Sequence, residues 1–379
     1  MEENPHTGTR LLVTLFMLLH ITTSMSPCPD FLKLAKVRPT HFLVAYNDGG
    51  LADRLINAVS TFYIALATRR VLCIRPPKSS KQPRLETAYD AVYSNWTCPS
   101  SALIDSSHEW RWRGILKNPT SKAGRFVYGS DWKSVLQSNL TVLRIWMQIG
   151  ITVGMFINPF SGVTARELGL LPETAFGCAF HHLFRPNMGA LRLAADIAPF
   201  NNPRSLDDPK KIVIGIQIRL GDAVIKKRKH NFTRMELDWN LSIQPFFSCA
   251  SELESSIQSV VNLDVSWFLI SDSEQVKHTA KVKYGEKIFV FPSEIEHYQN
   301  MTAFGFTTTV VEHWLFSKAV FHIISLRSGF GRTAAFASLR TGSLFTINVG
   351  IQSVRWKNRT CLVDDSDRPW EVSTHWSGI

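Results

Sequence analysis

The chain has 379 residues, of which 45% are hydrophobic, 11% aromatic and only 19% charged. This composition is typical of a packed globular protein and excludes a disordered or low-complexity chain, while the length favours two domains over one. Lys and Arg exceed Asp and Glu to give a net charge of +11, which predicts attraction to anions such as nucleic acid, an acidic membrane or the diphosphate of a nucleotide.

The first residues are typical of an export signal. Arg10 precedes the apolar run Leu11 to Ile21, and small polar residues follow at Thr22 to Ser26. The run is shorter than the ~20 residues that cross a bilayer, so residues 1–26 are predicted to be a signal peptide or a signal anchor. Six sequons follow, at Asn95, Asn139, Asn231, Asn240, Asn300 and Asn358. Together they favour the lumen of the endoplasmic reticulum or Golgi, in a secreted or type II membrane-anchored form.

Six cysteines lie far apart in the sequence and form no Cys-x-x-Cys pair: Cys28, Cys73, Cys98, Cys178, Cys249 and Cys361. A clustered metal site is therefore not expected. In an oxidising lumen some of them should pair, and fifteen complete pairings are open. Cys73 lies in an apolar run and also suits a buried thiol.

In the first half, residues 41–46 (HFLVAY) predict a strand that is followed by a glycine loop, a helix over 51–68 and a strand over 71–74. This order opens a parallel sheet. Residues 75–205 are rich in Trp and irregular in pattern, with helices expected near 132–147 and 187–198. We assign residues 27–205 to an N-terminal Rossmann-like lobe on the acceptor side.

The polar, proline-bearing stretch 201–210 predicts a linker. Beyond it, strands are expected over 211–219, 266–270, 288–291, 320–325 and 344–349. Helices are expected near 243–261, 273–283, 308–318 and 332–339. This alternation predicts a doubly wound α/β lobe over residues 206–350, with a tail over 351–379. Two such lobes with parallel sheets would face each other across a cleft, where ligands bind at the carboxyl ends of strands.

Two candidate anion sites follow predicted strands of the second lobe. Arg219 and Asp222 end the strand IGIQIRLGD, and an arginine there seeks a phosphate or a carboxylate; an ion pair with Asp222 is the alternative. The segment Ser328, Gly329, Phe330 and Gly331 follows another strand and precedes an alanine-rich helix. Its small residues and helix N-terminus suit a phosphate, although glycines before a helix often serve the turn alone.

Two further motifs follow strands. NDGGLADRL places Gly49 and Gly50 in a tight turn, with Asp53 and Arg54 in the first turn of a helix. It lacks both the GxGxxG and the P-loop spacing, and a packing turn is the alternative. ISDS ends a strand on Asp272 and Ser273, which suit the N–H donors of a base or the hydroxyls of a ribose, but equally the cap of the next helix.

The order of these motifs over residues 41–340 resembles the fucosyltransferases with two Rossmann lobes, the GT-B arrangement. That family includes protein O-fucosyltransferases, bacterial nodulation α1,6-fucosyltransferases and plant xyloglucan fucosyltransferases. The resemblance rests on GGLADRL, IQIRLGD, FLISDS and the segment 307–331 that ends in SLRSGFG. Gln217 replaces the family's usual histidine and Ser-Gly-Phe-Gly its Ser-Thr-Phe-Gly, which are departures that bear on guanine selectivity and donor affinity.

The resemblance implies a role for each motif. Arg219 would bind the β-phosphate of GDP-fucose, and the segment from Ser328 to Gly331 would supply further phosphate contacts. Asp272 and Ser273 would lie near the guanosine, and the segment from Gly49 to Arg54 would face the donor sugar and a glycan or glycoprotein acceptor. Transfer would invert the anomeric carbon and need neither a metal nor a cofactor, because an arginine and a helix N-terminus meet the leaving diphosphate.

The general base and some competing functions remain open at this stage. Asp222 and Asp53 are the candidate bases, and His181 and His182 are weaker ones. Asp365-Ser366-Asp367 spells the Asp-x-Asp of metal-dependent transferases, but its place near the C-terminus is typical of an exposed acidic tail. A non-catalytic lumenal sugar-nucleotide or glycan-binding protein and a transferase for another sugar nucleotide are alternatives. Nucleic-acid binding is disfavoured by the sequons, and the basic run 226–229 is typical of a solvated loop.

Overall fold

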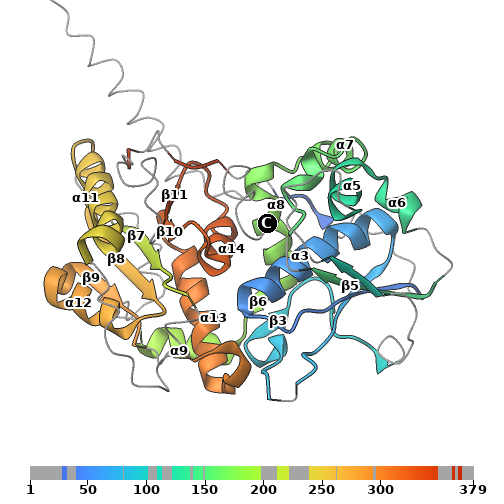
Figure 1. Cartoon of the computed structure of the whole chain (residues 1–379), viewed down its shortest axis with the longest axis horizontal. Coiled ribbons are helices and arrows are strands. Elements are labelled where there is room, and N and C mark those ends of the chain that lie inside the picture. The colour runs from blue at the N-terminus through green and yellow to red at the C-terminus, as the bar shows by residue number, and fades with distance from the viewer. Residues whose placement is uncertain are drawn as a thin grey trace, which may run out of the picture.

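A computed structural model gives the fold of the chain (Figure 1). It describes residues 28–31, 40–79, 81–100, 109–112, 122–136, 140–147, 150–197, 211–221, 239–261, 263–292, 296–348, 361–362 and 366–368. The predicted leader over 1–26 and the predicted linker over 201–210 lie outside the described residues.

The first half of the chain builds a four-stranded sheet with strand order β2-β1-β5-β4, and the three strand contacts in it are parallel. Its strands are β1 (Phe42–Ala45), β2 (Val71–Ile74), β4 (Glu109–Trp112) and β5 (Val142–Met147). A small antiparallel pair joins β3 (Tyr89–Ala91) to β6 (Phe184–Pro186). The helices are α3 (Leu51–Thr68), α5 (Lys122–Gly129), α6 (Trp132–Val135), α7 (Ser161–Glu167), α8 (Pro172–Leu183) and α9 (Met188–Ile197), with short turns η1 (Leu85–Thr87) and η2 (Gly154–Phe156).

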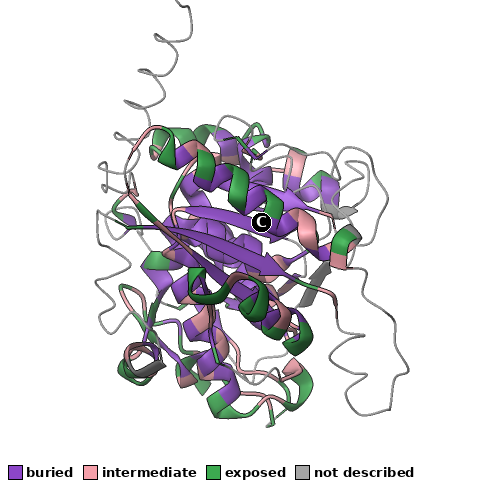
Figure 2. Cartoon of the chain, turned by 90° about the vertical axis from the view of Figure 1, so that its left-hand side faces the viewer, coloured by how far each residue is buried: buried purple, intermediate pink, exposed green. Residues whose placement is uncertain are grey.

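The second half builds a five-stranded, all-parallel sheet with strand order β11-β10-β7-β8-β9. Its strands are β7 (Lys211–Ile218), β8 (Asp264–Ser271), β9 (Ile288–Val290), β10 (Phe321–Ser325) and β11 (Leu344–Ile347). The helices are α11 (Gln244–Gln258), α12 (Glu274–Tyr284), α13 (Ala303–Ser317) and α14 (Gly329–Ala337), with short turns η4 (Trp239–Ile243), η5 (Gly285–Lys287) and η6 (Tyr298–Asn300). Figure 2 shows these buried strands among helices whose outer faces are exposed.

These elements follow from the sequence pattern. β7 and β10 are buried along nearly their whole length, as expected for apolar strands covered on both faces. Helix α3 ends where Arg69 takes a left-handed conformation with φ 56°, so that the Arg70 N–H donates to Ala65 O at 2.9 Å. The α/β class with parallel sheets is thus confirmed.

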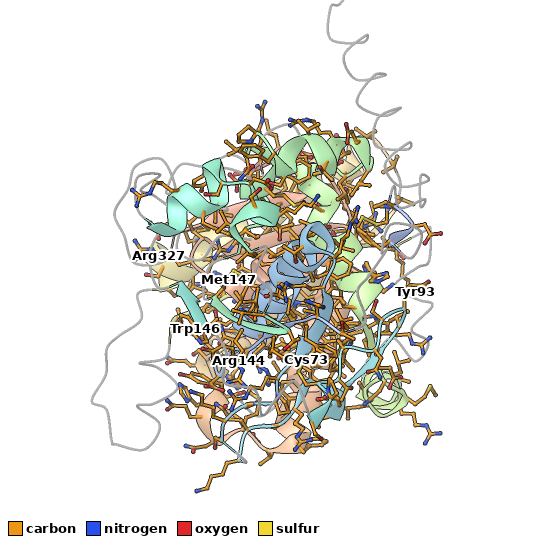
Figure 3. All side chains as sticks on the ribbon, turned by 90° about the vertical axis from the view of Figure 1, so that its right-hand side faces the viewer. Cys73, Tyr93, Arg144, Trp146, Met147 and Arg327 are labelled. Carbon is orange, nitrogen blue, oxygen red and sulfur yellow. A yellow bond between two sulfur atoms is a disulfide. The ribbon has the colours of Figure 1, made fainter. Side chains whose placement is uncertain are left out.

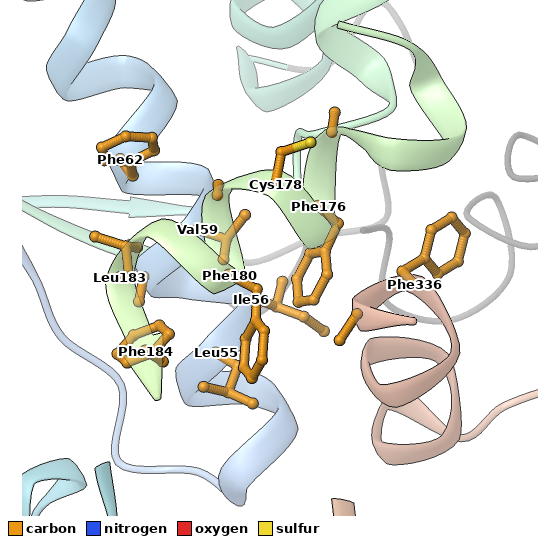
Figure 4. Close-up of a cluster of buried hydrophobic side chains, with 14 of the residues drawn as sticks. Leu55, Ile56, Val59, Phe62, Phe176, Cys178, Phe180, Leu183, Phe184 and Phe336 are labelled. Carbon is orange, nitrogen blue, oxygen red and sulfur yellow. The ribbon is translucent and has the colours of Figure 1, made fainter. Parts of the chain in front are cut away.

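The helices between the two sheets share one core. Side chains of α3, α8, α13 and α14 belong to a single buried cluster, and α14 packs against both α8 and α3. Figure 4 shows the α3 and α8 side chains of this cluster, to which α14 adds Phe336. At Gly177 of α8 a Cβ atom would lie only 2.5 Å from the carbonyl oxygen of Phe336. The missing side chain therefore sets how closely α14 approaches α8.

Three disulfides join Cys28 to Cys178, Cys73 to Cys98 and Cys249 to Cys361. The reading of Cys73 as a free buried thiol was therefore wrong: Cys73 is buried at the end of a strand, and its sulfur is bonded to Cys98. The first and third bridges tie residues near the two ends of the described chain to α8 and α11.

Three other expectations need correction. The predicted helix over 132–147 is the short helix α6 followed by strand β5, because the apolar run over 142–147 is long enough for a central strand that pairs with β1 and β4. The helices predicted over 308–318 and 332–339 begin earlier, at Ala303 and Gly329, where Thr302 and Ser328 cap them. The acidic tail is not simply exposed, since Asp367 accepts hydrogen bonds from Thr346 N and Oγ1 at 2.6 and 2.7 Å.

The α8–α14 contact makes a matched pair of substitutions informative. We expect Gly177→Ala to lower the free energy of unfolding by about 1–3 kcal/mol, because the added methyl group meets backbone rather than a yielding side chain. Gly129→Ala, at the end of α5 with nothing within 4 Å of the new Cβ, is the control and should be neutral or slightly stabilising. Urea denaturation measures both, and equal effects would contradict this packing.

Candidate functional site

Each sheet has one place where the order of its strands reverses. The chain passes from β7 to β8 and β9 on one side and then returns to β10 and β11 on the other, so the switch point lies between β7 and β10. In the first sheet it lies between β1 and β5, since β2 flanks β1 on the other side. Ligands of open α/β sheets bind beyond the carboxyl ends of strands at such points.

Arg219 directly follows β7 at the second switch point. Its backbone N–H donates to Ser325 Oγ at 2.8 Å, and the Ser325 hydroxyl donates to Gln217 O at 3.4 Å. Ser325 ends β10 and is buried, whereas the Arg219 side chain is exposed. The two strand ends are thus fixed to each other, with the guanidinium on the outside.

Asp272, just after β8, holds the turn that follows Arg219. Its Oδ1 accepts from Leu220 N at 2.8 Å and its Oδ2 from Gly221 N at 2.9 Å. Burial raises the pKa of Asp272, and the two N–H donors and the Arg219 charge partly oppose that rise. Gly221 has φ 102°, a conformation that favours glycine. Asp272 therefore supports the Arg219 turn, a role that the sequence motif did not reveal.

Ser273 and Ser328 both cap helices. Ser273 Oγ accepts from Val276 N at 3.4 Å at the start of α12, so the capping alternative holds for this residue. Ser328 is fully buried and its Oγ accepts from Gly331 N at 3.2 Å at the start of α14. Phe330 packs edge-on against His313 of α13, with ring centroids 5.3 Å apart. The N-terminus of α14, with Gly329 as its first residue, thus lies at the end of β10 beside the Arg219 turn.

Gln217 and Gly331 meet beneath the N-terminus of α14. A Cβ on Gly331 would lie 2.6 Å from Gln217 Oε1 and 2.9 Å from Ile324 Cγ2, so only glycine fits without displacement. Gln217 is buried, and within the described residues its Oε1 has no hydrogen-bond partner. Gln217 is therefore packed directly against the predicted phosphate segment.

At the first switch point the loop after β1 is equally well fixed. Asn47 Nδ2 donates to Met147 O at 2.7 Å, at the end of β5 (Figure 3), and Asn47 Oδ1 accepts from Gly49 N at 2.7 Å. A Cβ on Gly49 would lie 2.6 Å from Asp53 Oδ2, whereas Gly50 faces open space. Gly49 thus permits the Asp53 carboxylate, in the first turn of α3, to lie against the loop.

Arg332 of α14 is a further arginine near the site, outside the predicted motif residues. Its side chain is fully buried, and its Nε donates to Ser328 O at 3.3 Å. Burial lowers its pKa to about 10, and the negative charge of Asp53 opposes this shift. Arg332 therefore couples electrostatically the first turn of α14 to the first turn of α3. The signal that could have found it is a lone arginine directly before the small and largely apolar run from Thr333 to Ala337.

Arg54 of α3 also contacts the second half of the chain, here at helix α13. Its Nη1 donates to Pro83 O at 2.9 Å, and its guanidinium lies 5.0 Å from the ring centroid of Phe306 in α13. Burial lowers the pKa of Arg54 to about 10, and the charges of Glu86 and Asp48 oppose this. Arg54 is thus placed between α3 and α13, with most of its surface covered.

The remaining residues predicted from the sequence are Asp222, the sequons and the two histidines of α8. Asp222 lies outside the described residues, as do Asn139, Asn231 and Asn358, whereas Asn95, Asn240 and Asn300 are exposed. The two histidines of α8 have structural surroundings: His181 Nε2 is 2.7 Å from Ala337 O, and His182 is buried and stacks on Tyr93. Burial lowers the pKa of both. They support packing rather than a catalytic centre.

Two properties of the described residues bear on other functions. Their His, Cys, Asp and Glu side chains form no group of three that could hold a metal ion. As far as the chain is described, its helices lack the length and apolar character to span a membrane.

Comparisons with known proteins find similar structures but no similar sequences. Neither protein-family models nor the sequences of curated proteins give a match. Among solved structures, a mutant of FUT1 from Arabidopsis thaliana in complex with GDP is 12% identical, covers 89% of this chain and 78% of its own, and superposes with a TM-score of 0.53. NodZ from Bradyrhizobium is 12% identical, with coverages of 79% and 93% and a TM-score of 0.46. POFUT1 in complex with GDP is 12% identical, with coverages of 83% and 100% and a TM-score of 0.42.

The similarity to FUT1 extends over most of both chains at very low identity, which is the pattern of a shared fold. The chain therefore shares the α/β fold of the FUT1 structure, with its parallel sheets.

Proposed function

We propose that the protein is a glycosyltransferase that moves L-fucose from GDP-fucose to a glycan or glycoprotein acceptor. The observation that carries the proposal is the convergence of an exposed arginine and a helix N-terminus at one switch point. Arg219 follows β7, α14 begins after β10, and the Arg219 N–H bond to Ser325 Oγ holds the two together. Such a pair of positive features suits a diphosphate.

The proposed chemistry is an inverting displacement at the anomeric carbon of the fucose. Negative charge builds on the leaving diphosphate, where the Arg219 guanidinium and the free N–H groups at the start of α14 would receive it. Neither group needs a metal ion. Gln217 and Gly331 determine how closely the backbone of α14 lies to the strand ends, and would thereby tune the affinity for the donor.

The acceptor side is proposed to lie at the first switch point. Gly49 and Asp53 stand there, and the Asp53 charge acts on Arg332 in the turn that also carries the proposed phosphate contacts. As a hydrogen-bond acceptor, the Asp53 carboxylate would bind the acceptor hydroxyl and orient it. Asp222 stays a candidate base from sequence alone.

The secretory lumen, in the Golgi or endoplasmic reticulum, is the proposed compartment. Three disulfides support it because such bonds persist in oxidising compartments. The exposed sequon residues Asn95, Asn240 and Asn300 are open to glycosylation.

Substitution of Arg219 tests the donor assignment. We expect Arg219→Ala to reduce transfer from GDP-fucose by about 10²- to 10³-fold and to weaken GDP binding, because a preorganised contact to the diphosphate is lost. Arg219→Lys keeps the charge but not the planar fork, and should fall between Arg219→Ala and the unchanged protein. Lys211→Ala, exposed at the start of the same strand, is the control. More than about a tenth of the activity in Arg219→Ala would contradict the assignment.

Chelation tests the proposed independence from metals. Transfer by protein that has been dialysed against EDTA should equal transfer in Mg²⁺ or Mn²⁺, since the leaving charge is met by side-chain and backbone donors. A loss on chelation that Mn²⁺ restores would instead favour a metal-dependent mechanism. Calorimetry with GDP under both conditions separates an effect on donor binding from an effect on the transfer step.

A further inference from the structure

A basic loop runs beside the proposed acceptor side of the site. Residues 75–84 (RPPKSSKQPR) carry Arg75, Lys78, Lys81 and Arg84, one cation at every third position, and no acidic residue. Ser80 lies outside the described residues, and Lys78, Lys81 and Arg84 are exposed. This segment, called the basic loop below, connects β2 to η1.

The basic loop is held against the acceptor side by three hydrogen bonds. Lys78 N donates to Asp48 Oδ1 at 2.9 Å, and Gln82 Nε2 donates to Asp48 O at 3.1 Å. Arg54 Nη1 donates to Pro83 O at 2.9 Å, from the first turn of α3. Both ends of the loop are thus fixed to the segment between Asn47 and Arg54, so its cations have a defined place.

Two of the cations converge on one aromatic ring at the first switch point. Arg75 Cζ and Lys78 Nζ lie 5.9 and 6.0 Å from the ring centroid of Tyr46. Tyr46 follows β1, is buried, and its N–H donates to Ile145 O of β5 at 3.2 Å. The contacts therefore concentrate positive charge at the carboxyl end of the first sheet, where ligands of such sheets bind.

No ion pair neutralises these cations in the described part of the chain. None of the four forms an ion pair with a described carboxylate. Asp48 borders the loop through the bond from Lys78 N, and together with Glu86 it also acts on the buried guanidinium of Arg54. Like charges held close together repel one another, and an anion bound between them would relieve that repulsion.

We infer that the acceptor is an acidic oligosaccharide, with carboxylate or sulfate groups that the basic loop binds while a hydroxyl lies near Asp53. This inference rests on the proposed function, because it takes the first switch point as the acceptor side. The proposed donor contacts come from other elements, the end of β7 and the start of α14. The basic loop is therefore left for the second substrate.

The test compares matched sugars on the full-length protein. The probes are a galacturonate oligosaccharide with its methyl ester, and a sulfated N-acetyllactosamine with its unsulfated form, offered with saturating GDP. We expect at least one anionic probe to bind about tenfold more tightly than its neutral partner. This preference should shrink as NaCl rises from about 0.05 M to about 0.5 M, since exposed charges are screened.

Two triple variants assign the preference to the loop. Lys78→Gln/Lys81→Gln/Arg84→Gln should abolish it while leaving GDP affinity unchanged. Lys133→Gln/Arg192→Gln/Lys211→Gln removes the same charge from exposed positions on α6, α9 and β7 and should keep it. Equal binding of charged and neutral probes by the unchanged protein would overturn the inference, as would a loop variant that retains the preference.

Further measurements distinguish the acceptor role of the basic loop from a donor role and from membrane binding. Loss of GDP affinity in the loop variant would assign the loop to the donor and overturn the acceptor role. Binding to phosphatidylserine vesicles that depends on the loop, without any preference for the anionic sugars, would also overturn it. If GDP fails to bind the unchanged protein, the proposed function fails, whereas the sugar preference still reports on the loop.

Discussion

A fully buried guanidinium lies where the helices of the two sheets meet. Arg332 belongs to α14, its Nε donates to the carbonyl oxygen that begins this helix, and the negative charge of Asp53 in α3 partly opposes the effect of burial on its pKa. A charge removed from water costs several kcal/mol unless it is compensated, so the nearby Asp53 charge favours the observed packing of α14 against α3. The same turn of α14 carries Ser328 and Gly331, so this constraint also positions the proposed phosphate contacts.

The surroundings of this pair are rigid for ordinary packing reasons. Gly177 lets α14 approach α8, Gly331 lets it approach Gln217, and Gly49 lets the loop after β1 approach Asp53. On the other side of the second switch point, Asp272 receives the two N–H groups of the turn after Arg219. Close backbone approaches and the half-buried carboxylate of Asp272 thus fix both strand ends before any ligand arrives, which is the preorganisation that a transfer site needs.

The features that could be predicted from the sequence are those that depend on local residue pattern, such as apolar strands and the residues that follow them. The apolar runs of β1, β7 and β10 were predicted to within a few residues because buried parallel strands are continuous and hydrophobic. Strand β5 was mistaken for part of a helix, because a short apolar run fits either element until its neighbours are known. In the site, the placement of Arg219 and Ser328 after strands was confirmed, since a strand end is a local feature.

The partners of these residues could not be predicted, because they lie far away in the chain. Asp272 accepts hydrogen bonds from Leu220 N and Gly221 N, about fifty residues earlier, and neither a ligand contact nor a helix cap at Asp272 predicts that pairing. The pairing of Cys73 with Cys98 and the coupling of Arg332 to Asp53 likewise depend on tertiary structure.

The central claim is that Arg219 and the N-terminus of α14 together hold the diphosphate of a guanosine nucleotide. A crystal structure with GDP tests it most directly: the account predicts β-phosphate oxygens within hydrogen-bonding distance of the Arg219 guanidinium and the first N–H groups of α14, and GDP bound away from both would contradict it.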